Sequence, residues 1–422
     1  MSRDDTTHEA PTRRDYVKYG GAVIGGGLLA GCTGNSADGD NADTDSPKIE
    51  ESTGGETDSP EETKTPEDTS YSVTMEPVGE VTFEGVPTTW LSTDSELTDM
   101  AFCLGQIDGW IPTPLRSFNY FEHLGVDLRS RYPNSDPYTW KEGEADYDGK
   151  EYVYEVEPDL LMFFPQRRLV YNKAWDEGDL EEISENVAPI FGTNVYRNNS
   201  SLNYDQPSIY EAFEKLARVF KEEARYEAFV EVHDQMIRTV NSKLPPEEER
   251  PTIAYLSDAS DPNRGNIYPV GFDGELGQSK HFRDLEAVNA FEISEQTDYE
   301  GLLQADPDVI IIQGALEYTG NLVSDENGEA VFDLDQFRKN YVLPMEDNSV
   351  GQKVTAVQEN RIEPGGVSRQ GPLTNLYNTE ILAQQVYPKQ FGEFDPENPF
   401  DSAEEHQLFD RERVRDIING DL

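Results

Sequence analysis

The sequence predicts an α/β protein of two lobes joined by a long helix, and two features support this prediction. Four segments are predicted to be strands: the short segment 88–92, the apolar runs 159–164 and 308–312, which are bounded by Pro and turn residues, and the similar segment 252–257. Runs that are apolar on both faces are typical of buried strands in a parallel sheet. Between the predicted strands at 159–164 and 252–257, residues 207–244 carry apolar side chains at the i, i+3, i+4 spacing of a helix pair. Strands on both sides of this segment indicate two lobes, with a ligand cleft expected where the strands of each lobe end.

The first 31 residues are predicted to lie outside the fold. Arg13 and Arg14 form a twin-arginine pair, and a weakly apolar, Gly-rich stretch follows and ends in the residues LAGC. This stretch is shorter than the roughly 20 residues that a membrane span needs, but it fits the apolar region of a signal peptide. We interpret residues 1–31 as a twin-arginine lipoprotein signal peptide and Cys32 as the lipidated first residue of the mature chain. A short uncleaved anchor is the alternative.

Residues 32–70 are predicted to be a disordered acidic tether. This segment contains no aromatic residue after Cys32, and it buries too little apolar surface to offset the entropy lost on ordering. We therefore divide the remaining chain into an N-terminal α/β lobe (71–205), linking helices (206–246) and a C-terminal α/β lobe (247–422).

The composition is strongly acidic, with 84 Asp and Glu against 34 Lys and Arg and a net charge of −50. Such self-repulsion destabilises a compact state in dilute buffer. At molar salt the Debye length falls to about 3 Å, and most of the repulsion is screened. We read the chain as an extracellular, salt-adapted protein, as from a halophile. The charge argues against nucleic acid as a partner.

Cysteine and histidine usage argues against a disulfide framework and against direct metal ligation. If Cys32 carries the lipid, Cys103 has no partner within the chain and is expected to be a small buried hydrophobe. The five histidines show no ligand spacing, although His123 or His281 could serve as an axial haem ligand. We expect neither a metal site nor a cofactor.

One phrase, E-x6-P-D followed by an apolar run, occurs twice in the chain. Glu151 precedes Pro158 by seven residues, and Glu300 precedes Pro307 by the same spacing. We expect each lobe to contain a helix that ends near Pro-Asp, followed by a buried strand. The carboxyl ends of two such strands would form the walls of the cleft.

Several segments, in their order behind a lipoprotein signal, resemble one protein family. They are GEVTFEGVPTTW (79–90), EYVYEVEPDLLMFF (151–164), ENVAPIF (185–191), PTIAYLS (251–257), EGLLQADPDVIII (300–312), GPLTNLYNTEILAQQVYP (371–388) and QLFDRERV (407–414). The chain resembles the solute-binding lipoproteins, here of haloarchaeal type, of ABC importers for ferric siderophores, haem and cobalamin. The resemblance implies two Rossmann-like lobes bridged by one rigid α-helix, with an ABC permease and ATPase as partners. It also implies that Glu151 and Glu300 dock onto permease arginines. Ordinary acidic surface is the alternative for both.

Ligand contacts are expected from side chains that follow the predicted strand ends. The candidates are Trp110, Gln166, Arg167, Arg168, Tyr196, Arg197, Arg264, Tyr268, Gln313 and Arg369. Trp and Tyr can stack on a flat organic ligand, and Arg can pair with hydroxamate, catecholate or carboxylate oxygens. Trp110 could equally be a core side chain, and Arg167 with Arg168 could form surface ion pairs.

The function that the resemblance implies is capture of a ferric siderophore at the outer face of the cell membrane and its delivery to the permease. Cobalamin, haem, an oxyanion or another metal complex are alternatives within the same class. A secreted enzyme is less favoured because the chain has no HExxH, GxSxG or Walker motif. A structural or adhesive surface protein would not need paired strand ends or a bridging helix.

Overall fold

The computed structural model describes residues 70–132, 149–166, 169, 175–197, 202–272, 274, 277–291, 295–317, 319–324 and 330–422. The expectations for the signal peptide, Cys32, the tether, Arg167 and Arg168 fall outside the described residues. Residues Tyr71–Leu422 form one compact unit.

The first lobe is built on a parallel sheet of order β4-β3-β5. Its strands are β3 (Trp90–Ser92), β4 (Trp110–Ile111) and β5 (Leu160–Met162), and an antiparallel hairpin of β1 (Tyr71–Met75) and β2 (Gly79–Phe83) precedes them. The helices of this part are α2 (Ser95–Cys103), α3 (Phe118–Leu124), α4 (Leu128–Arg131), α5 (Lys150–Val156) and α6 (Glu177–Asn186). The strands predicted at 88–92 and 159–164 are therefore confirmed, and each is shorter than the predicted segment.

The second lobe contains a parallel sheet of order β11-β8-β6-β7. Its strands are β6 (Thr252–Leu256), β7 (Val288–Asn289), β8 (Val309–Ile312) and β11 (Ile362–Pro364). Around them lie α9 (Lys280–Asp284), α10 (Tyr299–Ala305), α11 (Leu334–Phe337), α12 (Leu343–Asp347), α13 (Thr355–Gln358), α14 (Pro372–Val386) and a hairpin of β9 (Leu322–Ser324) and β10 (Ala330–Phe332). The strands predicted at 252–257 and 308–312 are confirmed.

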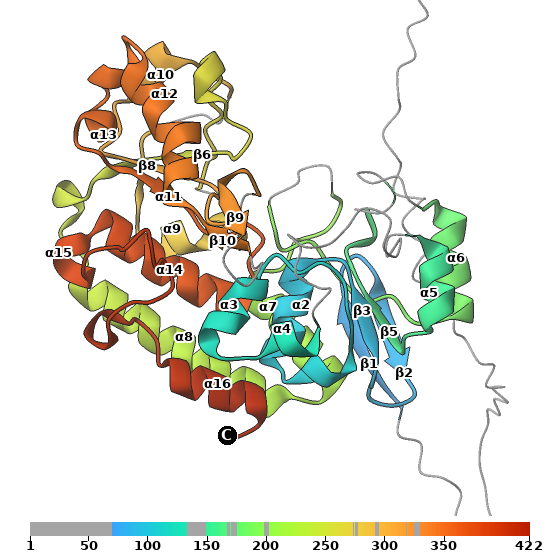
Figure 1. The fold of residues 1–422 in the computed structure, drawn as a ribbon. Helices are drawn as coiled ribbons and strands as arrows, with labels where there is room; N and C mark the ends of the chain where they lie inside the picture. The colour runs from blue at the N-terminus through green and yellow to red at the C-terminus, as the bar shows by residue number, and fades with distance from the viewer. Residues whose placement is uncertain are drawn as a thin grey trace, which may run out of the picture. The chain divides into compact units, whose positions relative to one another are not determined.

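Two helices link the lobes, as the spacing predicts. Helix α7 (Ile209–Phe220) begins at a capping box formed by Ser208 and Glu211, and α8 (Glu223–Lys243) is 21 residues long. Lys221, in the left-handed region at φ 57°, separates the two helices. Figure 1 shows α8 running alongside the C-terminal helix α16 (Arg411–Asn419), and the two helices are in contact. The predicted α/β architecture of two lobes with parallel sheets and one long linking helix is confirmed.

The repeated phrase builds the same local structure in both lobes. Helices α5 and α10 are each seven residues long, and each ends at an acidic residue in the left-handed conformation, Glu157 (φ 42°) and Asp306 (φ 41°). Because proline cannot continue a helix, the Pro-Asp that follows directs the chain into β5 or β8.

The aspartate of each Pro-Asp pins the start of the neighbouring strand. The Oδ2 atom of Asp159 accepts hydrogen bonds from the backbone N–H groups of Thr88 and Thr89, both at 2.9 Å. In the second lobe, Oδ2 of Asp308 accepts the N–H of Thr252 at 2.7 Å and its hydroxyl at 2.9 Å. The aspartates of the repeat thus have a structural role that the sequence alone does not indicate.

The two lobes share one hydrophobic core at their junction. The largest cluster of buried side chains draws on α2, α7, α8, α9 and α14. Within it, Asp99 of α2 accepts the N–H groups of Leu373 and Thr374 at 3.0 and 3.1 Å and so caps α14 of the other lobe. Burial raises the pKa of Asp99 to about 6 in spite of these hydrogen bonds. Cys103 is buried here as a free thiol, as expected.

Candidate ligand-binding site

Polar side chains converge where the strands of both lobes end. In the first lobe, Glu96 follows β3 and Gln166 follows β5, and both are buried. In the second lobe, Gln313 directly follows β8 and is 4% exposed. Tyr268 lies beside the end of β6, because its carbonyl accepts the N–H of Ser257 at 2.8 Å. Gln166, Tyr268 and Gln313 therefore lie where parallel strands of α/β proteins bind ligands.

Tyr196 is the centre of a cluster that draws on both lobes. The guanidinium carbon of Arg369 lies 4.3 Å from the centre of the Tyr196 ring, and that of Arg197 lies 4.6 Å from it. The Tyr196 hydroxyl is 3.0 Å from Nη2 of Arg197, which donates to it, and 3.3 Å from the hydroxyl of Ser368. The structure thus brings together Tyr196 and Arg197 from one segment and Arg369 from another, three residues that the sequence analysis selected.

Arg369 also pairs with a residue that the sequence analysis missed. Its Nη1 lies 2.9 Å from Oε1 of Glu96, across 273 positions of sequence. The Glu96 side chain is 5% exposed, whereas the Arg369 side chain is 26% exposed. Glu96 stands four residues after the end of β3, so the same rule of strand ends that selected Gln166 could have found it.

Two of the predicted ligand contacts have other partners in the structure. Trp110 is 3% exposed and packs edge-on against Phe102 and Tyr132, with ring centres 5.0 and 5.1 Å away. The core alternative for Trp110 is therefore the one that the structure supports. The side chain of Arg264 is 78% exposed, and its Nε pairs with Asp261 at 3.3 Å, so Arg264 lies on the surface of the second lobe.

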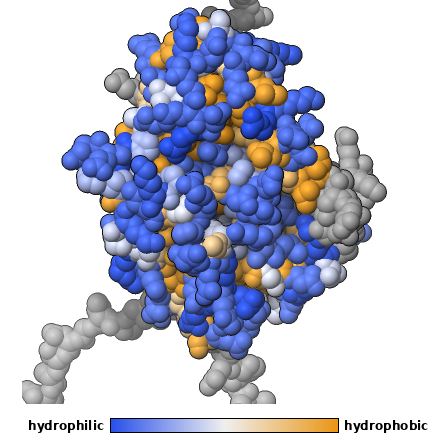
Figure 2. All heavy atoms as spheres, turned by 60° about the vertical axis from the view of Figure 1, so that its left-hand side comes forward, coloured by the Kyte–Doolittle hydropathy of each residue, from blue (hydrophilic) through white to orange (hydrophobic). Residues whose placement is uncertain are grey.

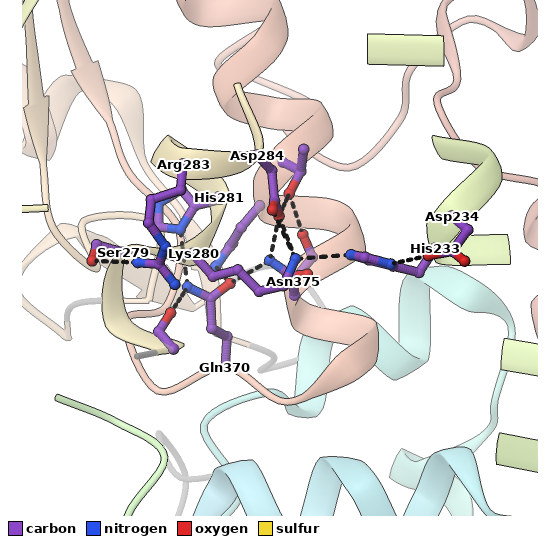
Figure 3. Close-up of polar contacts among 12 residues, drawn as sticks. His233, Asp234, Ser279, Lys280, His281, Arg283, Asp284, Gln370 and Asn375 are labelled. Atoms are coloured by element: carbon purple, nitrogen blue, oxygen red, sulfur yellow. Dashed lines mark hydrogen bonds and ion pairs between the residues drawn. The ribbon is translucent and has the colours of Figure 1, made fainter. Parts of the chain in front are cut away.

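A partly buried polar network lies on the side of the second lobe (Figure 3). Nζ of Lys280 lies 2.7 Å from Asp284 and 2.8 Å from Nε2 of His233, which belongs to the linking helix α8. Close by, Nε2 of Gln370, the residue after Arg369, lies 2.9 Å from Nδ1 of His281. The network therefore connects α8, α9 and the segment that carries Arg369.

Both histidines of this network are held neutral by burial. Burial lowers the pKa of His281 to about 3 and that of His233 to about 4, and the Lys280 charge adds to the shift in each. A neutral His233 can donate from Nδ1 to Asp234 and accept from Lys280 at Nε2. A neutral His281 can likewise accept the hydrogen bond from Gln370.

The His281→Gln variant is expected to lose less stability in acid than the wild type. Because the folded pKa of His281 lies below its unfolded value near 6.5, its contribution is complete above pH 6.5 and is lost as the pH falls toward 3. The free energy of unfolding of the wild type, relative to the variant, should fall by about 1.4 kcal/mol per pH unit below 6.5. Urea unfolding of both proteins from pH 7 to pH 5 measures this difference.

The wild type must be compared with the variant because two buried carboxyl groups change the stability with pH in the direction opposite to the histidines. Burial raises the pKa of Asp99 to about 6 and that of Glu363 to about 7. Their protonation in mild acid relieves a destabilisation and offsets the histidines in the wild-type curve. If the free energy of unfolding changed with pH in the same way in the wild type and in His281→Gln, the lowered pKa assigned to His281 would be contradicted.

His123 and His281 are the candidates for an axial haem ligand, and both have other partners in the structure. His281 is buried with Nδ1 bonded to Gln370, and His123 stacks on Phe400 at 4.5 Å and lies 3.9 Å from Asp401. Among the described residues, no group of three or more His, Cys, Asp or Glu side chains could hold a metal ion.

The two glutamates of the repeat occupy equivalent places. Glu151 and Glu300 are exposed, and each is the second residue of its helix, α5 and α10. A carboxylate in the first turn of a helix is also favoured by the helix dipole, so position alone does not assign a role in docking. In the part of the chain that the structure describes, no helix combines the length and apolar character of a membrane span.

Comparison with known proteins identifies the family. A family model described as periplasmic binding protein matches residues 127–362, more than half of the chain. A search of curated proteins found no match. Several solved structures share the fold. A periplasmic binding protein from Veillonella parvula is 17% identical, with a TM-score of 0.54, 78% of this chain covered and 94% of that one.

Two further structures carry more specific names. The TroA-like periplasmic binding protein FepB from Veillonella parvula is 13% identical, with a TM-score of 0.52 over 80% of this chain and 95% of that one. The iron uptake ABC transporter substrate-binding protein PiuA from Streptococcus pneumoniae is 13% identical, with a TM-score of 0.50 over 75% of this chain and 98% of that one. Likeness at these identities concerns the fold. Together with the match of the family model, the two lobes and their linking helix lead to one conclusion: this chain belongs to the periplasmic binding protein family.

Proposed function

We propose that this protein is the extracellular substrate-binding component of an ABC importer, and that it captures a ferric siderophore and delivers it to the permease. Its family consists of solute-binding proteins rather than enzymes. One observation carries the proposal: Tyr196 and Arg197 of the first lobe meet Ser368 and Arg369 of the second where the strands end. An aromatic ring flanked by guanidinium groups suits a flat, oxygen-rich chelate. The pneumococcal protein of similar fold is named as an iron uptake substrate-binding protein.

The proposed contacts are Gln166, Tyr196, Arg197, Tyr268, Gln313 and Arg369, with Arg167 and Arg168 added from the sequence. Glu151 on the first lobe and Glu300 on the second are proposed to dock onto permease arginines, because paired Arg–carboxylate contacts give geometric specificity.

The ATPase completes the transporter. We further propose export by the twin-arginine signal of residues 1–31, a lipid anchor at Cys32, the tether of residues 32–70 and the lobe boundaries given above.

Calorimetric titration tests the proposed ligand class. The full chain in molar KCl is titrated with a ferric trihydroxamate, a ferric tricatecholate, haem and cobalamin. Saturable one-to-one binding of one ferric chelate, weakened at least tenfold in Arg197→Gln/Arg369→Gln, supports the proposal. Binding of haem or cobalamin alone moves the assignment to that ligand. If none of the four binds, an oxyanion or another metal complex takes the place of iron.

The salt-adapted character makes a separate prediction. Hydrophilic residues dominate the face shown in Figure 2, and the net charge of the chain is −50. Because self-repulsion is screened at high ionic strength, the melting temperature should rise steeply between 0.1 and 2 M KCl. Circular dichroism during heating measures it, with sorbitol of equal osmolarity as the control. An unchanged melting temperature across this range would contradict salt adaptation.

A further inference from the structure

The environment of Tyr196 is unusual for so acidic a chain. Only 34 of 422 residues are Lys or Arg, yet two guanidinium groups lie within 5 Å of this one ring, at 4.3 and 4.6 Å. Such a pair of cations would by itself favour an anionic ligand. Arg197 is exposed, whereas the Arg369 side chain is 26% exposed.

The positive charge of Arg369 is not fully available to a ligand, because Glu96 forms an ion pair with it. Oε1 of Glu96 accepts from Nη1 of Arg369 at 2.9 Å, and Oε2 is buried without a hydrogen-bond partner in the described structure. Burial disfavours the charged form of Arg369, but the fields of Glu96 and of Asp94, the residue at the start of α2, outweigh this effect and raise its pKa. Among these four described residues, the two positive charges of Arg197 and Arg369 are matched by the two negative charges of Asp94 and Glu96.

Displacing Glu96 from Arg369 is costly. A ligand anion that took the Arg369 guanidinium would leave a buried carboxylate with neither oxygen in an ion pair, and uncompensated buried charges are strongly destabilising. A neutral chelate can accept hydrogen bonds from Arg197 and from the outer N–H groups of Arg369 without separating this pair. The ion pair of Glu96 and Arg369 therefore discriminates between ligands by their charge rather than by their shape.

We propose that Glu96 is a specificity-determining residue: by occupying Arg369 it selects an iron chelate without net negative charge, such as a ferric trihydroxamate, against an anionic one. This inference rests on the proposed function. It predicts that the wild type binds a neutral ferric trihydroxamate more tightly than a ferric tricatecholate of charge −3. It also predicts that neutralising Glu96 reduces that preference.

The test compares the two chelates across the wild type and four variants in molar KCl. Glu96→Gln keeps an acceptor for Arg369 but removes the competing charge, so affinity for the tricatecholate should rise about tenfold while affinity for the trihydroxamate changes less than about threefold. The matched control is Glu380→Gln, which neutralises the carboxylate of another buried pair, Glu380 with Arg411 at 2.6 Å. It should leave both affinities unchanged. Introduced into Arg369→Gln, the Glu96→Gln change should no longer affect the tricatecholate.

The outcomes separate this inference from the proposed function. If either chelate binds but Glu96→Gln leaves the ratio of affinities unchanged, or weakens both, the role of Glu96 is overturned and the siderophore function stands. A wild type that prefers the tricatecholate also overturns it. If neither ferric chelate binds the wild type or Glu96→Gln, the proposed function fails and this inference fails with it. Thermal melting of each variant confirms that the protein titrated is folded.

Discussion

Replacing Glu151 and Glu300 together by lysine is expected to abolish import while changing ligand affinity less than about twofold. Both carboxylates are exposed, one on each lobe, in the first turns of α5 and α10. Each would contribute a charge-assisted contact with a permease arginine, and a lysine there places two like charges together. Loss of one such pair typically costs 2–5 kcal/mol, so the double variant should fall below detectable transport.

Uptake of labelled chelate by cells or proteoliposomes containing the permease and ATPase measures this effect, and calorimetry measures the affinity. The matched control is Glu155→Lys/Glu295→Lys, which makes the same change of charge at exposed positions near the same two helices. The control should transport at close to the wild-type rate. Equal loss of uptake in both double variants would show that charge in general, rather than docking by Glu151 and Glu300, is responsible.

The second large effect concerns stability: Arg411→Met is expected to lower the free energy of unfolding by about 3–5 kcal/mol. The Glu380 side chain, on α14, is 1% exposed, and its Oε1 accepts from Nη2 of Arg411 at 2.6 Å. Oε2 accepts the backbone N–H of Leu408 at 2.6 Å. Removing the guanidinium leaves a buried carboxylate without its counter-ion at the point where the C-terminal segment is attached to α14.

Urea unfolding in molar KCl measures the loss, and a second variant identifies its cause. In Arg411→Met/Glu380→Leu both charges are absent, and much of the stability should return, because replacing a whole buried pair by apolar groups is often close to neutral. The double variant still loses the carboxylate that accepts from Ser402 and Leu408, so recovery will be incomplete. A single variant that costs less than about 1 kcal/mol would mean that solvent screens the pair.

The elements that the sequence predicts are those whose signal is local. Helices α7 and α8 follow from apolar side chains at helical spacing, and the strands β5, β6 and β8 follow from apolar runs that end at Pro and turn residues. The boundaries differ by a few residues because backbone pairing, and not the apolar run, decides where a strand ends. The run at 159–164 continues through two phenylalanines beyond β5.

Trp110 and Tyr196 show that the local sequence does not predict whether an aromatic residue lies in the core or at the site. Both are aromatic residues near a predicted strand end, yet Trp110 packs against Phe102 and Tyr132 in the core, whereas Tyr196 meets Arg369 from the other lobe. Nothing within a few residues of either position distinguishes these fates. Phe102 and Tyr132 lie 8 and 22 positions from Trp110, whereas Arg369 lies 173 positions from Tyr196, so the deciding contacts are beyond the range of local patterns.

The sequence by itself determined the α/β class, the long linking helix and the duplicated helix–Pro-Asp–strand unit, because periodicity and turn chemistry act over a few residues. Only the tertiary structure decided that the aspartates of that unit, Asp159 and Asp308, fasten neighbouring strands. It alone also decided that Glu96 holds Arg369. Hydrogen bonds and ion pairs between distant segments depend on how the sheets and helices pack. In a chain with 84 Asp and Glu residues, the local sequence around one carboxylate does not indicate which residue it will contact.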